Sequence, residues 1–141
     1  MRHRTTLFYV DDNPKSSRLL TSVLEECGFR VIPRNNPIEA LAQCQSTCFD
    51  LALLDYEMPL MSGSRLAREI KLLVPDVPVV LISGRASLPP TELAFVDAHF
   101  GFGTALDDLL WTLRTLGEPK LGRMPDQRSV ERPLAQWADS T

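Results

Sequence analysis

The sequence has no hydrophobic run long enough to cross a membrane and no dense block of basic residues. A transmembrane helix needs about 20 consecutive apolar residues, and no apolar stretch in this chain of 141 residues approaches that length. The formal net charge is −3, and no cluster of Lys and Arg would attract the phosphates of a nucleic acid. We therefore expect a protein that does not span a membrane and does not bind nucleic acid directly.

Cysteine is also scarce, with only Cys27, Cys44 and Cys48 in the chain. An odd number of cysteines and no secretory leader favour the reducing cytoplasm and free thiols over a disulfide framework. Cys44 and Cys48 have the spacing of half a metal site, but no second pair of Cys or His follows. We expect both to be thiols in the core.

Apolar runs alternate with segments of helical periodicity along most of the chain. This alternation is typical of an α/β fold with a doubly wound parallel sheet, in which helices cover both faces. At 141 residues and 44% apolar composition, one domain is expected. The predicted strands are residues 6–10, 29–32, 51–54, 77–82 and 98–102.

The helical segments begin near Pro14, near Pro37 and after Gly63, and a short or displaced fourth segment covers 91–96. The last helix has the clearest apolar stripe, which ends before Gly117. Trp111 lies off that stripe, so we expect it to face solvent, where it either covers a local gap or marks a contact surface. We expect a domain at 1–117 and, at 118–141, a proline-containing tail that serves as a linker or a short docking helix.

Three acidic residues follow apolar runs. Asp11 and Asp12 come directly after the first predicted strand, and Asp55 comes directly after the third. The carboxyl ends of parallel strands meet at one edge of a sheet, so these carboxylates should converge there. Such a cluster suits Mg²⁺, which binds proteins through a few carboxylates together with water and phosphate oxygens. The alternative is solvated acids in two unrelated turns.

These acids belong to a longer pattern that carries a family resemblance. The pattern is Asp11-Asp12, Asp55 with Met58-Pro59, Met61 and Gly63 after it, and Ser83 at the end of the fourth strand. In this order and setting, it resembles the receiver domain of bacterial two-component response regulators, over residues 6–116. The resemblance implies a flavodoxin-like sheet with strand order 2-1-3-4-5.

The resemblance also implies site roles. Asp55 would accept a phosphoryl group from the phosphohistidine of a sensor kinase, and Mg²⁺ would be held by Asp11, Asp12, Asp55 and the backbone carbonyl of Glu57. A carboxylate nucleophile and a cation that neutralises the transferred charge are sufficient for this chemistry. Such a domain is a signalling module and not an enzyme.

Three further positions match the family. Ser83 takes the place of the switch hydroxyl, which donates to the phosphoryl oxygen, and His99 takes the place of its aromatic partner. The alternative for each is an ordinary strand residue. Gly63 stands where the turn into the next helix favours a residue that tolerates positive φ.

The chain departs from the family after the fifth strand. The family carries a lysine followed by a cis proline there, whereas this chain has Phe102 and Gly103. Without the lysine ammonium, the site lacks one charged hydrogen bond, which would contribute about 1.5–3 kcal/mol. Arg85 is a candidate to reach over the site and supply a cation in its place, and Glu57 is a candidate partner for it; the alternative is an ordinary loop arginine.

Two functions follow. In the first, a cytoplasmic receiver is phosphorylated by a sensor histidine kinase or a phosphotransfer protein and signals through contacts with a downstream protein, with a homodimer left open. In the second, a degenerate receiver acts as a phosphorylation-independent interaction module. A phosphatase with an aspartyl intermediate is a weak third candidate, because Asp11 and Asp12 are adjacent and that class separates its two acids by one residue.

Overall fold

The computed structural model describes residues 4–118, and the tail predicted at 118–141 lies outside them except for its first residue. A five-stranded sheet in the order β2-β1-β3-β4-β5 forms the centre, and all neighbouring strands are parallel. Its strands are β1 (Thr6–Val10), β2 (Arg30–Arg34), β3 (Leu51–Asp55), β4 (Val79–Ser83) and β5 (Ala98–Gly101). The predicted strand order and fold class are confirmed.

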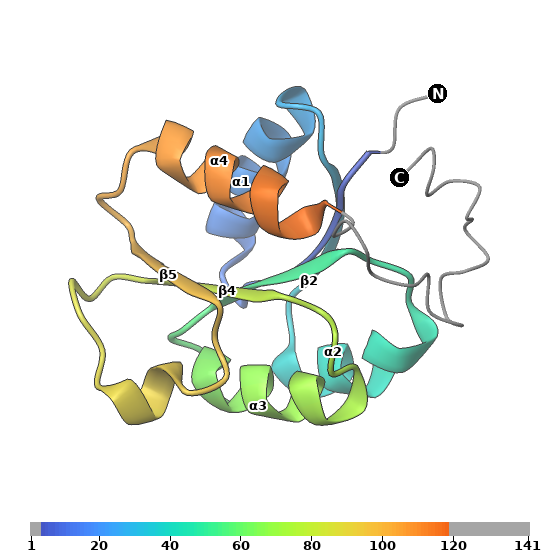
Figure 1. Cartoon of the computed structure of the whole chain (residues 1–141), viewed down its shortest axis with the longest axis vertical. Coiled ribbons are helices and arrows are strands. Elements are labelled where there is room, and N and C mark those ends of the chain that lie inside the picture. The colour runs from blue at the N-terminus through green and yellow to red at the C-terminus, as the bar shows by residue number, and fades with distance from the viewer. Residues whose placement is uncertain (1–3, 119–141) are drawn as a thin grey trace.

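Helices cover both faces of the sheet (Figure 1). On one face lie α1 and α4, and on the other lie α2 and α3, as expected of a doubly wound fold. Their bounds are α1 (Pro14–Glu26), α2 (Pro37–Gln43), α3 (Gly63–Leu73) and α4 (Leu106–Gly117), with 3₁₀ turns η1 (Cys44–Ser46) and η2 (Pro90–Leu93). None of the helices in the range 4–118 is long and apolar enough to span a bilayer.

The segment predicted as a short fourth helix is only the 3₁₀ turn η2. Pro90 occupies its first position, and no side chain caps its beginning, so little favours extension into a full helix. The link between β4 and β5 is therefore mostly irregular chain.

Alternation along the strands divides the core into two layers. In β1, Phe8 and Val10 pack toward α2 and α3, whereas Leu7 and Tyr9 pack in the cluster that includes residues of α1 and α4. Every residue of β3 and β4 is buried, as in parallel strands covered on both faces. Residue parity in a strand therefore decides which layer a side chain enters.

Several details differ from the sequence predictions. The strand β2 continues beyond residue 32 to Arg34, because an edge strand tolerates Pro33. All three cysteines are free, and Cys44 is buried as expected, but Cys48 is exposed, so its prediction as a core thiol is wrong. Trp111 does face solvent, with 67% of its surface exposed.

Candidate phosphoacceptor and metal site

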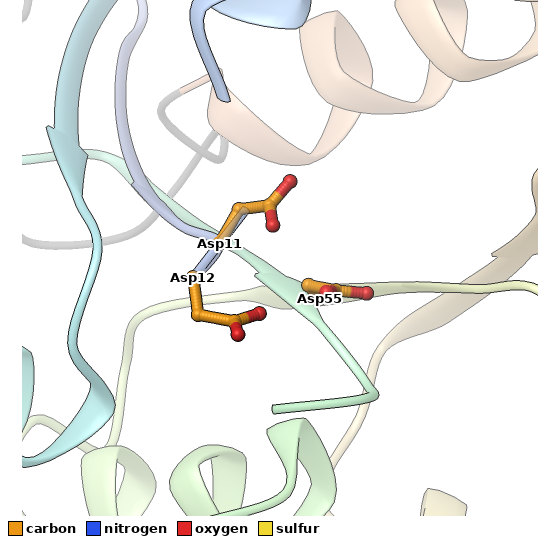
Figure 2. A group of neighbouring side chains, drawn as sticks. All are labelled: Asp11, Asp12 and Asp55. Atoms are coloured by element: carbon orange, nitrogen blue, oxygen red, sulfur yellow. The ribbon is translucent and has the colours of Figure 1, made fainter. Parts of the chain in front are cut away.

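The three acidic residues converge at the carboxyl edge of the sheet. β1 and β3 are neighbours with Val10 opposite Leu54. Asp11, which follows β1, therefore lies beside Asp55, which ends β3. One carboxylate oxygen from each of Asp11, Asp12 and Asp55 lies within 4.8 Å of the others. Figure 2 shows the three side chains as neighbours at the ends of the two strands. The alternative of two unrelated acidic turns is excluded.

The Asp11 carboxylate is almost fully buried and is held at both oxygens. The Tyr9 hydroxyl donates to Asp11 Oδ2 at 2.7 Å, and the Asn13 backbone N–H donates to Asp11 Oδ1 at 3.0 Å. The Asn13 side chain in turn accepts from the N–H groups of Lys15 and Ser16 and so begins α1. The start of α1 and the orientation of Asp11 are thus fixed together.

Asp55 is buried at the end of β3, and its Oδ1 atom has no hydrogen-bond partner within the described residues. Burial, and next the charge of Asp11, raise the pKa of Asp55 from 3.8 to about 7; Asp12 and Glu57 add to the shift, and a hydrogen bond from the Glu57 backbone opposes it. An unpartnered buried oxygen beside two further carboxylates is the donor set that a hard divalent cation requires. The residues present therefore fit Mg²⁺.

Tyr9 connects the acidic cluster to the core. Its ring is 1% exposed, and burial together with the neighbouring Asp11 raises the pKa of its phenol far above the ordinary range, so the hydroxyl stays protonated as a donor. Tyr9 is not among the site residues predicted from the sequence. The available signal was its position two residues before Asp11, which places both side chains on the same face of the strand.

Gly63 begins α3 directly beneath the end of β3. A Cβ at this position would overlap the backbone carbonyl oxygen of Asp55 and lie 2.7 Å from Leu81 Cδ1. The predicted reason for this glycine, tolerance of positive φ, is wrong, because Gly28 is the only glycine with positive φ among residues 4–118. The glycine instead allows α3 to approach the backbone that carries Asp55.

Ser83 and His99 lie on adjacent strands. Ser83 is fully buried at the end of β4, and its Oγ accepts the backbone N–H of Arg85 at 2.8 Å. His99 lies opposite Leu81 in β5, so its side chain and that of Ser83 face the same side of the sheet. The Nε2 atom of His99 is buried with no hydrogen-bond partner in the described chain. The positions are compatible with a coupled pair of side chains.

Arg85 lies at the rim of the site, which is formed by the loops that follow β3, β4 and β5. Arg85 Nε lies 3.5 Å from Glu57 Oε2, and the guanidinium lies 5.7 Å from the centroid of the Tyr56 ring. Both partners of the ion pair are more than half exposed, so the pair is weak and easily exchanged. In the part of the chain that the structure describes, no ion pair reaches any of the three clustered carboxylates.

Phe102 also lies at this rim. Its backbone N–H donates to the carbonyl of Ser83 at 2.9 Å, and its ring approaches Gly84 so closely that a Cβ there would lie 3.4 Å from it. The ring remains 67% exposed. The chain after β5 therefore places an apolar ring and no positive charge beside the end of β4.

Comparison with known protein families matches residues 7–102 to the response regulator receiver domain. The chain belongs to this family. Receiver domains are signalling modules of two-component systems, so the expected class of protein is confirmed. The acidic pocket at the sheet edge is of the type that serves a Mg²⁺-dependent phosphoacceptor.

Among similar proteins, the transcriptional regulatory protein DctD, which regulates C4-dicarboxylate transport in Rhizobium meliloti, is 30% identical over 90% of this receiver chain and 28% of its own length. The transcriptional regulatory protein ZraR of Klebsiella oxytoca is 33% identical over 93% of the chain and 30% of its own length. The chain thus spans less than a third of these two relatives.

Solved structures agree with the fold. The response regulator TrrA from Thermotoga maritima, solved in complex with Mg²⁺-BeF, is 28% identical with a TM-score of 0.72, and the match covers 79% of this chain and 98% of that one. A CheY-like receiver domain from Methanospirillum hungatei is 26% identical with a TM-score of 0.73 and covers 82% and 94%. FixJ-N, at 20% identity and a TM-score of 0.76, supports the fold alone.

Proposed function

We propose that this receiver domain accepts a phosphoryl group on Asp55 from the phosphohistidine of a sensor kinase or a phosphotransfer protein. A carboxylate oxygen of Asp55 attacks phosphorus, the phosphorus–nitrogen bond breaks, and the imidazole leaves with that electron pair and takes up a proton. The observation that carries the proposal is the buried Asp55 carboxylate: its Oδ1 has no hydrogen-bond partner among the described residues, and one of its oxygens lies within 4.8 Å of an oxygen from each of Asp11 and Asp12.

Asp11, Asp12 and Asp55, with the backbone carbonyl of Glu57, would hold Mg²⁺. When bound, the cation supplies the positive charge that compensates the acids and the transferred phosphoryl group. The structure of TrrA, which is 28% identical to this chain, was solved in complex with Mg²⁺-BeF. That complex supports the proposal of a magnesium site here. Asp11 is prepared for this role by its two fixed oxygens.

Ser83 is the proposed switch hydroxyl, and His99 the proposed partner that follows its movement. The backbone N–H of Arg85 now donates to Ser83 Oγ, and the hydroxyl proton of Ser83 is free to be offered to a phosphoryl oxygen on the neighbouring strand. The buried Nε2 of His99 without a partner is consistent with a side chain that changes its surroundings between two states.

In this proposal, Asp55 is phosphorylated without the lysine that the family resemblance predicts after the fifth strand. Phe102 and Gly103 stand at those positions, and Arg85 is the proposed replacement. Its weak, exposed pair with Glu57 leaves the guanidinium available for a stronger, charge-assisted bond to a phosphoryl group on Asp55. The Tyr56 ring would support the arginine side chain during this exchange.

The proposed signalling partners are a sensor histidine kinase or phosphotransfer protein upstream and another protein downstream, in the cytoplasm. Residues 118–141 are proposed to connect to a partner or to dock as a short helix, beyond the receiver domain at 1–117. The exposed Trp111 and Phe102 supply apolar contact surface for such partners or for a second copy of the chain.

Intact-mass measurement after incubation with acetyl phosphate tests the proposal. We expect one added phosphoryl group in the presence of Mg²⁺, none with EDTA, and none in Asp55→Asn. Labelling of Asp55→Asn, or no labelling of the wild type with Mg²⁺, would refute the phosphoacceptor role; the second outcome, together with unchanged amide spectra on adding Mg²⁺ and beryllium fluoride, would favour the constitutive interaction module.

The role of Arg85 has its own test in the same assay. A lost charged hydrogen bond costs about 1.5–3 kcal/mol, so Arg85→Gln should slow phosphorylation about 10-fold to 100-fold. Arg68→Gln is the matched control, because Arg68 lies on α3 with its side chain exposed and pairs only with its neighbour Glu69 among the described ion pairs. Equal rates for the two variants would eliminate Arg85 as the replacement cation.

A further inference from the structure

Tyr9 is a buried polar residue that the phosphoacceptor chemistry leaves without a role. It lies in β1 between β2 and β3, 1% exposed, in the apolar layer that contains Leu53 and Leu110. A phenylalanine would fill such a layer as well. The hydroxyl must therefore have a partner, because an unpaired polar group in this environment is costly. That partner is Asp11 Oδ2, at 2.7 Å.

The two hydrogen bonds to Asp11 arrive at different oxygens. The Tyr9 hydroxyl reaches Oδ2, and the Asn13 backbone N–H reaches Oδ1 at 3.0 Å. Each carboxylate oxygen can accept two bonds, so each retains one lone pair. Two fixed oxygens set the plane of the carboxylate, and Asp11 is 3% exposed, which leaves little room for another rotamer.

The two donors differ in what they depend on. The Asn13 N–H belongs to the backbone at the start of α1 and is present for any residue there other than proline. The Tyr9 hydroxyl is supplied by one side chain, reaches Asp11 from the core, and is placed there because residues two apart in a strand share a face. It is therefore the one of the two contacts that a substitution can remove without moving the backbone.

We propose that Tyr9 is a positioning residue for the divalent cation: its hydroxyl holds the Asp11 carboxylate in the orientation that the metal requires. The inference rests on the proposed magnesium site and adds a residue to it. Hydrogen bonds to metal-ligating carboxylates orient them, and removing such a bond typically lowers metal affinity about 10-fold to 100-fold. Tyr9 acts through Asp11 and does not contact the cation.

The test is a calorimetric titration of the full chain with MgCl₂ at one pH. We expect Tyr9→Phe to raise the Mg²⁺ dissociation constant about 10-fold or more. Ser64→Ala is the matched control, because it deletes a part-buried hydroxyl that donates to the backbone carbonyl of Glu92 and not to the acidic cluster. Its dissociation constant should equal that of the wild type. Circular dichroism in EDTA establishes that the three proteins are folded at the titration temperature.

A second readout uses the wild type alone and does not require the variant to fold. A buried hydroxyl bonded to a carboxylate exchanges slowly with water, so the Tyr9 proton should be resolved by NMR and should shift as Mg²⁺ is added. Equal dissociation constants for Tyr9→Phe and wild type, or a Tyr9 proton that does not respond while Mg²⁺ binds, would overturn the inference. A wild type that binds no Mg²⁺ would instead overturn the proposed site and the inference with it.

Discussion

Replacing Asp55 with asparagine should stabilise the metal-free protein, and the gain should depend on pH. The pKa of Asp55 is raised to about 7 by burial and by Asp11, which is unusual for a carboxylic acid. The folded state therefore binds this proton more tightly than the unfolded chain does. This contribution favours the folded state below pH 4 and is lost as the pH rises through about 7.

The size of the effect follows from the same shift. Moving the pKa from 3.8 to about 7 corresponds to roughly 4 kcal/mol at pH 8, where the wild type carries a buried charge. Two charges 4.8 Å apart in a medium of effective dielectric constant about 20 repel by about 3 kcal/mol, which is of the same order. Asparagine has the same shape, keeps one acceptor oxygen and carries no charge.

Urea unfolding of wild type and Asp55→Asn in EDTA measures the difference. We expect the variant to have the larger free energy of unfolding at pH 8, and the gap to narrow by about 2–3 kcal/mol at pH 5. Asp76→Asn, at an exposed position, is the control and should show no comparable gap. The reasoning is refuted if the gap is the same at both pH values or if Asp55→Asn is the less stable protein at pH 8.

Three further outcomes are expected from urea unfolding of variants. Gly63→Ala should lose about 1–3 kcal/mol, because its methyl group meets the backbone at the end of β3, whereas Gly103→Ala, with open space around the new Cβ, should change stability by less than about 1 kcal/mol. Asn13→Ala should lose about 1 kcal/mol through the cap of α1. Leu113→Ala should lose about 2–5 kcal/mol from a fully buried position, whereas Trp111→Ala, largely exposed on the same helix, should lose less than about 0.5 kcal/mol.

The acidic cluster could be predicted because topology alone determines it. Once residues 6–10 and 51–54 are recognised as parallel neighbours, the positions that follow them must meet at one edge, whatever the side chains do. The pair of Arg85 and Glu57 could be anticipated in the same way, since both residues follow the ends of adjacent strands. Predictions of this kind need strand order and direction, but no knowledge of side-chain packing.

Features decided by packing could not be predicted. The reason for a glycine at position 63 is one example. The sequence shows a glycine before a helix, but it does not show how closely that helix approaches the backbone of Asp55. Cys44 and Cys48 are one helical turn apart in the sequence, but η1 ends at Ser46, between them. As a result, Cys44 is buried and Cys48 is exposed. The hydroxyl of Tyr9 was missed because a tyrosine in a buried strand fits the hydrophobic pattern equally well without a partner.

The charge balance at the site links metal and proton binding. With its pKa raised to about 7, Asp55 is partly protonated in the metal-free protein at neutral pH, whereas a metal ligand and a nucleophile must both be ionised. A cation that enters the cluster must therefore displace this proton as well as water. Without the cation, ionising all three acids is unfavourable because their negative charges repel one another. No arginine or lysine in the described chain pairs with the cluster, so this compensation depends on the bound cation. The role that we propose for Arg85 begins only after a phosphoryl group has arrived. Loading with Mg²⁺ should therefore precede phosphorylation of Asp55.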